Sequence, residues 1–142
     1  MTRHPMKFID SSAAPFETLE QWRLSPRDGA FVSVPNDFDV ESLEAELPRL
    51  AGIALHFPKW VDGRAYSQAR LLRSRFRFGG EVRATGEVLV DMVPLLQRTG
   101  FDTAQMRAGQ SVEAAQRALQ FFPGHYQGDV TETRPLFARG AA

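Results

Sequence analysis

Short apolar runs alternate with amphipathic stretches along most of the chain. The amphipathic stretches carry apolar residues at spacings of three and four, which predicts helices after Asp37 or Asp39, over about residues 65–76, after Asp91 and after Ser111. The apolar runs are short and bounded by turn residues, which predicts strands at 31–34, 53–57, 81–84 and 103–106. Strand-to-strand spacings of about 20 to 30 residues suit β-α units with short loops. The pattern therefore predicts an α/β fold, a mostly parallel sheet of four or five strands, open or as a half-barrel.

The same spacing predicts which side of each helix is buried. The expected inward residues, from the first helix to the last, are Val40, Leu43, Leu47 and Leu50; Ala65, Ala69, Leu72 and Phe76; Leu89, Val93 and Leu96; and Val112, Ala115, Leu119 and Phe122. Pro48 should make the end of the first helix irregular. Gly52, the pair Gly79-Gly80 and Gly100 separate the elements. Trp22 and Leu24 suggest a further short strand, and residues 125–130 a final extended piece.

The 142 residues are the usual length of one domain. Prolines at 5, 15 and 26 and the Asp28-Gly29 turn predict an irregular N-terminal extension over residues 1–30. Residues 31–130 form the expected α/β domain. Residues 131–142 are rich in Arg, Gly and Ala and are expected to be a flexible tail.

Composition excludes several classes of protein. A formal net charge of zero argues against a dedicated nucleic-acid binder, and the lack of cysteine excludes disulfides, thiol chemistry and cysteine-ligated metal centres. No apolar run reaches the ~20 residues of a membrane span, and the N-terminus lacks the long apolar stretch of a signal peptide. His4, His56 and His125 lack metal-ligand spacing, and His56 is expected in the core. We therefore expect a soluble, cytoplasmic protein with no bound metal or cofactor.

A polar loop follows the strand at 53–57. In a parallel sheet, loops at the carboxyl ends of strands surround the ligand site, and Lys59, Asp62 and Arg64 would emerge there. Glu87, Asp91 and Arg107 follow other predicted strands at the same edge. A lysine or tyrosine facing carboxylates can do acid–base work, so the candidate catalytic residues are Lys59, Asp62, Tyr66 and Asp91. The alternative is structural: Asp62-Gly63 is an ordinary turn pair, and Asp62 and Asp91 can cap helices.

Four side chains share one stripe of the helix over 65–76, namely Tyr66, Arg70, Arg73 and Arg77. Guanidinium groups on one side of a helix suit sulfate-, phosphate- or carboxylate-like ligands. In the alternative interpretation, these arginines are solvated or paired with Glu81, Glu87 or Asp91. The glycines at 79, 80 and 86 match neither the dinucleotide fingerprint nor the phosphate loop, and no Gly-x-Ser-x-Gly elbow is present.

Three segments, FPKWVDGRAYSQARLLR, GEVRATGEVLVDM and GFD, resemble an uncharacterised bacterial family over roughly residues 52–126. Members are labelled oxidoreductases involved in sulfite reduction, and their genes lie near those for sulfite reductase and phosphoadenosine-phosphosulfate reductase. The matching positions are Lys59, Asp62, Gly63, Arg64, Tyr66, Ser67, Arg70, Leu72, Arg73, Glu81, Arg83, Gly86, Asp91, Gly100, Phe101 and Asp102. The chain departs from the pattern at Trp60, Glu87, Val90 and Met92. The last two replace polar groups beside Asp91.

The resemblance implies a role in assimilatory sulfate or sulfite reduction. Without cysteine, the chain can neither reduce an adenylyl sulfate through a thiol nor ligate an iron–sulfur cluster, which favours an accessory protein. It would bind a small oxyanion or dock on sulfite reductase or phosphoadenosine-phosphosulfate reductase, with Trp60 as an anchor. The alternative is an oxidoreductase that acts directly in sulfite reduction. The expected anion-binding or docking residues are Lys59, Trp60, Arg64, Arg70, Arg73 and Arg83. A half-barrel leaves its edges open, so a homodimer is a corollary.

Overall fold

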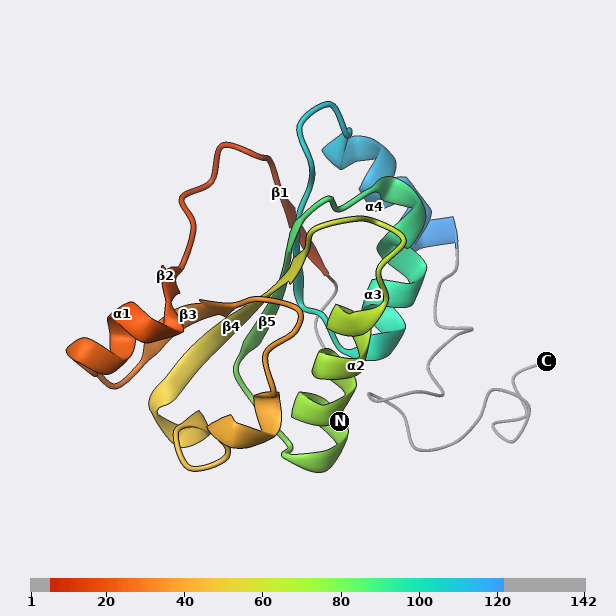
Figure 1. Ribbon diagram of the computed structural model, residues 1–142. Helices are drawn as coiled ribbons and strands as arrows, with labels where there is room; N and C mark the ends of the chain where they lie inside the picture. Colours follow the sequence, from red (N-terminus) through yellow and green to blue (C-terminus); the bar gives the residue numbers. More distant parts are fainter. Residues whose placement is uncertain (1–5, 122–142) are drawn as a thin grey trace, which may run out of the picture.

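Parallel strands in the order β1-β6-β5-β4-β3-β2 form one open sheet (Figure 1). The computed structural model describes residues 6–121. Within them the strands are β1 (Lys7–Ile9), β2 (Glu17–Thr18), β3 (Ala30–Val34), β4 (Leu50–Phe57), β5 (Glu81–Gly86) and β6 (Thr103–Gln105). The predicted α/β fold with a parallel sheet is confirmed. The sheet has six strands rather than four or five, because residues before Ala30 supply β1 and β2.

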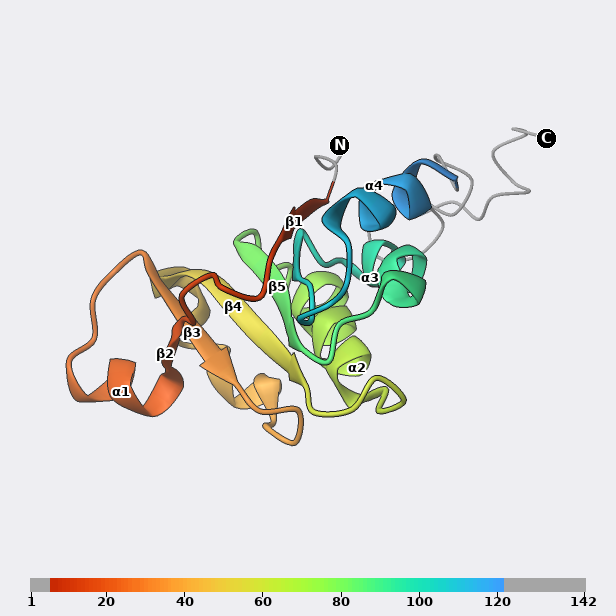
Figure 2. The same cartoon turned by 90° about the horizontal axis from the view of Figure 1, so that it is seen from above.

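The α-helices of the described residues are α1 (Leu19–Leu24), α2 (Arg64–Arg70), α3 (Val93–Thr99) and α4 (Val112–Phe121). A π-helical turn, η3 (Leu71–Arg75), continues α2, and the shorter 3₁₀ turns are η1 (Val40–Leu43), η2 (Leu47–Arg49) and η4 (Val90–Met92). Figures 1 and 2 show α2, α3 and α4 grouped on one side of the sheet. The strand residues on that side must therefore be apolar.

The register of the strands separates two unlike faces. Ile53 pairs with Val32 and Val82, and all three are fully buried. Phe57 belongs to the same face of β4, because side chains alternate along a strand, and its ring lies 5.0 Å from that of Tyr66 on α2. The opposite face carries Ser33, Ala54, Arg83 and Thr103 in one row, and His56 beside Thr85 in the next. The helices thus cover a face of large apolar residues and leave a face of smaller and polar ones.

Residues 10–18, which we call the N-terminal strap, connect the two edges of the sheet. β1 pairs with β6 at one edge and β2 pairs with β3 at the other (Figures 1 and 2). On the way the strap crosses the face that the helices leave uncovered. The Phe16 ring lies 4.3 Å from the guanidinium carbon of Arg83 and 5.2 Å from the ring of Phe31. The Gln105 amide donates a hydrogen bond of 3.1 Å to the carbonyl of Ala13.

Trp22 lies in a helix, and the prediction of a strand at Trp22 and Leu24 is wrong. Thr18 and Gln21 form a capping box, in which each side chain accepts a hydrogen bond from the other's backbone N–H, at 3.1 and 3.0 Å. Trp22 is buried, and its indole N–H donates to the carbonyl of Arg27 at 2.9 Å. The Thr-x-x-Gln spacing was a visible signal for this helix start.

Two helix boundaries also differ from prediction. The helix expected after Asp37 or Asp39 is the pair of turns η1 and η2, and Leu50 already belongs to β4. Asp39 does cap η1, accepting from the N–H of Glu41 at 3.0 Å. Asp91 is not a cap, because it lies inside η4 and α3 begins at Val93.

The later boundaries agree with the sequence. Gly100 ends α3 in the left-handed conformation, with φ of 105°. The hydroxyl of Ser111 accepts a hydrogen bond of 3.0 Å from the N–H of Ala114 at the start of α4. The extended piece expected at 125–130, the tail at 131–142, and the residues Phe122, His4 and His125 lie outside the described residues.

Candidate functional site

The loop between β4 and α2 presents an apolar pair to the solvent. Trp60 is 53% exposed and its neighbour Val61 is 66% exposed, and both are large hydrophobic side chains. Lys59 beside them is exposed too. Within residues 6–121 it makes no ion pair. The loop leaves the carboxyl end of a central strand, as the sequence predicts.

Asp62 and Arg64 form an ion pair where this loop meets α2. Asp62 accepts three side-chain hydrogen bonds from Arg64, the shortest at 2.8 Å. It also accepts one of 3.0 Å from the Arg64 N–H and one of 2.8 Å from the Asn36 amide. The hydrogen bonds from Arg64, with a smaller contribution from Asn36, hold the pKa of the Asp62 carboxyl well below its usual range. Asp62 thus organises the turn before α2, the structural alternative that the sequence left open.

Tyr66 lies on the helix-covered side of the sheet. Its ring contacts Phe57 at 5.0 Å and Phe101 at 6.3 Å, in edge-on geometry. Burial raises the pKa of Tyr66 to about 12, so the phenol stays protonated at neutral pH. Arg70, one turn further along α2, is exposed.

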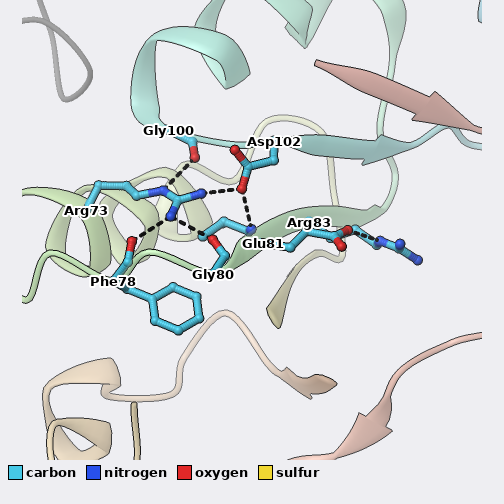
Figure 3. Close-up of polar contacts among 8 residues, drawn as sticks. Arg73, Phe78, Gly80, Glu81, Arg83, Gly100 and Asp102 are labelled. Carbon is cyan, nitrogen blue, oxygen red and sulfur yellow. Dashed lines mark hydrogen bonds and ion pairs between the residues drawn. The ribbon is translucent and has the colours of Figure 1, made fainter. Parts of the chain in front are cut away.

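Arg73, predicted to bind an anion or a partner, is instead locked inside the protein. Its guanidinium donates to the carbonyls of Gly100 at 2.9 Å, Phe78 at 2.6 Å and Gly80 at 2.8 Å, and forms an ion pair with Asp102 (Figure 3). The side chain is only 5% exposed. Its contacts give Arg73 a structural role between η3 and the amino ends of β5 and β6.

Arg83 lies beneath the N-terminal strap. Its Nε donates to the Glu81 carboxylate at 2.9 Å, and its guanidinium packs on the Phe16 ring at 4.3 Å (Figure 3 shows the pair with Glu81). The side chain is largely buried. Arg83 therefore supports the strap. Asp91 is exposed in η4 and is separate from this contact.

A pocket of about 680 Å³ lies between the strap and the sheet. Its floor comes from the carboxyl halves of the central strands, and its other walls come from the strap, α1 and the segments that follow β3 and β6. The lining residues are Ser11, Pro15, Phe16, Thr18, Leu19, Glu20, Arg23, Ser33, Val34, Pro35, Phe38, Ala54, His56, Thr85, Gly86, Gln105, Met106, Arg107 and Ala108. We call this the strap pocket.

His56 lines the strap pocket and is exposed, so the prediction that it belongs to the core is wrong. Its Nδ1 lies 3.4 Å from the hydroxyl of Thr85. The ring rests against Gly86, where a Cβ atom would come within 2.7 Å of the His56 Cε1 and 2.4 Å of the Phe57 carbonyl oxygen. The lack of a side chain at Gly86 therefore leaves room for the His56 imidazole to pack against the backbone at the floor of the pocket.

The predicted site residues do not converge. Lys59, Trp60 and Asp62 share one loop, and Arg64 begins α2 directly after it. Of the residues expected at the carboxyl edge, only Arg107 lines the strap pocket. The signal for the pocket was the run Ile53 to Phe57, in which Ala54 and His56 alternate with larger apolar residues.

Residues 6–121 hold no cluster of three or more His, Asp or Glu side chains suited to a metal ion. No helix in that range is both long and apolar enough to span a bilayer.

A family model described as a bacterial protein of unknown function (DUF934) matches residues 31–137. No curated protein matches the chain. The matched range contains the loop after β4 and the floor of the strap pocket, while the strap itself precedes it.

Proposed function

The chain belongs to the bacterial DUF934 family, for which no function is named, and from that premise we propose that it is an accessory protein of assimilatory sulfate or sulfite reduction that docks on sulfite reductase. The sulfur pathway comes from the sequence resemblance alone. The docking role comes from the loop between β4 and α2.

The observation that supports docking is the exposed pair Trp60 and Val61. Large apolar side chains next to each other on a surface loop are characteristic of protein–protein contacts, and tryptophan is enriched among residues that dominate binding energy. Lys59 adds a positive charge beside them. The partner surface would therefore have an apolar recess with acidic residues at its rim.

Docking fits the arginines better than binding of a free oxyanion does. Arg64 is engaged by Asp62, and Arg83 by Glu81 and Phe16. Arg73 is enclosed by carbonyls and Asp102. Lys59 and Arg70 are the predicted anion-binding residues that make no ion pair within residues 6–121. Two exposed cations are a weak site for sulfate or sulfite, because water screens each of them.

Binding to purified sulfite reductase of the same bacterium tests the proposal. Trp60→Ala should weaken binding by more than about tenfold, as expected when an interface anchor is truncated. Leu24→Ala is the matched control, because Leu24 is an exposed hydrophobic residue on α1, away from the loop. If the wild-type protein does not bind, or if both variants bind equally well, docking through this loop is wrong.

The strap pocket favours a second candidate function, an oxidoreductase that acts directly in sulfite reduction. Here His56 would be the group that meets the substrate. A deletion strain complemented with single variants separates the two roles. Docking predicts that Trp60→Ala fails to restore growth on sulfate while His56→Gln succeeds. Direct catalysis predicts the reverse, with Trp60→Ala tolerated.

A further inference from the structure

The floor of the strap pocket is built mostly from small side chains, with the imidazole of His56 among them. Ser33 and Ala54 are neighbours on β3 and β4, and Thr85 with Gly86 continues the floor on β5. The same strands carry Val, Ile, Leu and Phe on their other face. Because these residues are small, they leave a space between the sheet and the strap that covers it. The space is about 680 Å³, within the usual range of small-molecule sites.

The roof of the pocket is fixed by specific contacts. The Gln105 amide donates to the carbonyls of Ser11 and Ala13, at 3.4 and 3.1 Å. The Ser33 hydroxyl donates to the carbonyl of Glu17 at 3.3 Å. Phe16 is held between Arg83 and Phe31. Because both ends and the middle of the strap are attached to the sheet, the space between strap and sheet is a preformed site.

The walls are mostly apolar, with a few polar groups that can orient a ligand. Leu19, Phe38 and Met106 provide apolar surface. His56 faces the same space, and its Nε2 makes no hydrogen bond within residues 6–121.

The cations at the rim are Arg23 and Arg107. Arg23 is tightly paired with Glu46 at 2.7 Å, whereas Arg107 lies 3.6 Å from Glu87 in a loose, exposed pair. Such a pair contributes little, so the Arg107 guanidinium can turn to an anion in the pocket.

We infer that the strap pocket binds a small, flat aromatic anion, with the aromatic body between the strap and the sheet and the acidic group near His56 and Arg107. The apolar walls exclude water from the ring system, and the imidazole and guanidinium supply the donors that an acidic group needs. This inference goes beyond docking through Trp60, because the strap pocket and the docking loop share no residue.

Fluorescence titration with 1-anilinonaphthalene-8-sulfonate, an aromatic sulfonate, tests the inference. We expect saturable binding at one site. Ala54→Leu, which extends a side chain from the floor into the pocket, should weaken binding by about tenfold or more. Arg107→Gln should weaken it by about threefold to fivefold, the usual effect of one exposed charge. The neutral probe N-phenyl-1-naphthylamine should bind with no response to Arg107→Gln.

Trp60→Ala is the control, since its exposed ring could also attract an apolar dye; this variant should bind the sulfonate as the wild type does. Should Ala54→Leu fail to fold, proton NMR of the wild-type protein provides a second readout. The Cε1 proton of His56, identified among the chain's three histidines by its loss in His56→Gln, should shift on saturation. A wild-type protein that does not bind, full binding by folded Ala54→Leu, or an unmoved His56 signal would each overturn the inference.

Discussion

Arg73 and Asp102 form an ion pair that joins the helix-covered side of the sheet to the start of β6. The same Asp102 oxygen accepts a hydrogen bond of 3.0 Å from the N–H of Val82, so one carboxylate serves both a side chain and a strand (Figure 3). Arg73 in turn donates to three carbonyls, those of Phe78 and Gly80 before β5 and that of Gly100 at the end of α3. The pair therefore fixes where β5 and β6 begin relative to η3.

Arg73→Ala should lower the free energy of unfolding by about 3–5 kcal/mol, because it removes the buried guanidinium that donates to three carbonyls and pairs with Asp102. Arg73→Lys should recover only a small part, since an ammonium cannot reproduce the planar fork. Urea unfolding followed by circular dichroism measures both. Arg70→Ala, an exposed arginine of α2, should change stability by less than about 0.5 kcal/mol. Equal effects at the two positions would contradict the structural role.

Gly86→Ala should destabilise the protein by about 2–3 kcal/mol. The residue has φ of 92°, and a Cβ atom there would lie 2.4 Å from the Phe57 carbonyl oxygen. Thermal unfolding provides the measurement. Gly63→Ala is the matched control, because a Cβ atom at Gly63 meets nothing within 4 Å and its φ is negative. A stable Gly86→Ala protein would mean that β5 ends differently.

The Asp62 carboxyl should make the stability of the protein vary with pH in the acid range. Its pKa is lower in the folded protein than in the unfolded chain, so the stabilisation is present above the unfolded value of about 3.9 and is lost as pH falls through the folded value. The melting temperature of Asp62→Asn should therefore lie below that of the wild type from neutral pH to about pH 5. The gap should narrow below about pH 4. A gap that does not depend on pH would show that charge on Asp62 is irrelevant.

The phenol of Tyr66 should ionise at a higher pH than that of an exposed tyrosine. The chain has two tyrosines, and burial raises the pKa of Tyr66 to about 12. The pKa of Tyr66 in the folded protein is above the value of about 10 in the unfolded chain, so the folded state favours the neutral phenol. The stability that depends on the neutral phenol is complete below pH 10 and is lost as pH rises toward 12. Absorbance at about 295 nm should show a late ionisation that Tyr66→Phe removes. An unchanged alkaline titration curve in Tyr66→Phe would disprove the assignment.

Gln105→Ala should loosen the strap without unfolding the sheet. It removes the hydrogen bonds to the carbonyls of Ser11 and Ala13, which together contribute about 1–2 kcal/mol. Chymotrypsin should then cut after Phe16 about fivefold to tenfold faster than in the wild type, because cleavage requires the strap to open locally. Gln116→Ala, an exposed glutamine on α4, should leave the rate unchanged. A similar rate in both variants would show that Gln105 does not hold the strap.

The central strands were predictable because each is a compact apolar run. β1 and β2 were not, since Lys7–Ile9 and Glu17–Thr18 are too short to carry a period and owe their form to β6 and β3. Arg73 was misassigned for a different reason. The prediction that Arg73 shares a face with Tyr66 and Arg70 assumes an unbroken α-helix, in which each residue is rotated by about 100° from the one before. The π-helical turn over Leu71–Arg75 changes this rotation, so the side chain of Arg73 is buried beside Leu72.

The strap pocket was hidden because its walls come from segments distant in sequence. Alternation along β4 indicates that Ala54 and His56 share a face, but not that the strap returns to cover it. Periodicity describes each strand alone, whereas the pocket depends on Gln105 meeting the carbonyls of Ser11 and Ala13. By contrast, the exposure of Lys59 and the turn at Asp62 are local, and the sequence located both.

The attachment of the strap at two edges also sets an order of assembly. β2 can find β3 soon after it leaves the ribosome, because few residues separate them. β1 must wait until almost the whole described chain has been made, since Lys7 pairs with Thr103. Until then β5 is an unpaired edge of the sheet, and a nascent chain in that state offers an open strand to its neighbours. Of the described strands, the one made earliest is thus the last to be placed, and it adds to the edge of the open sheet beside β6.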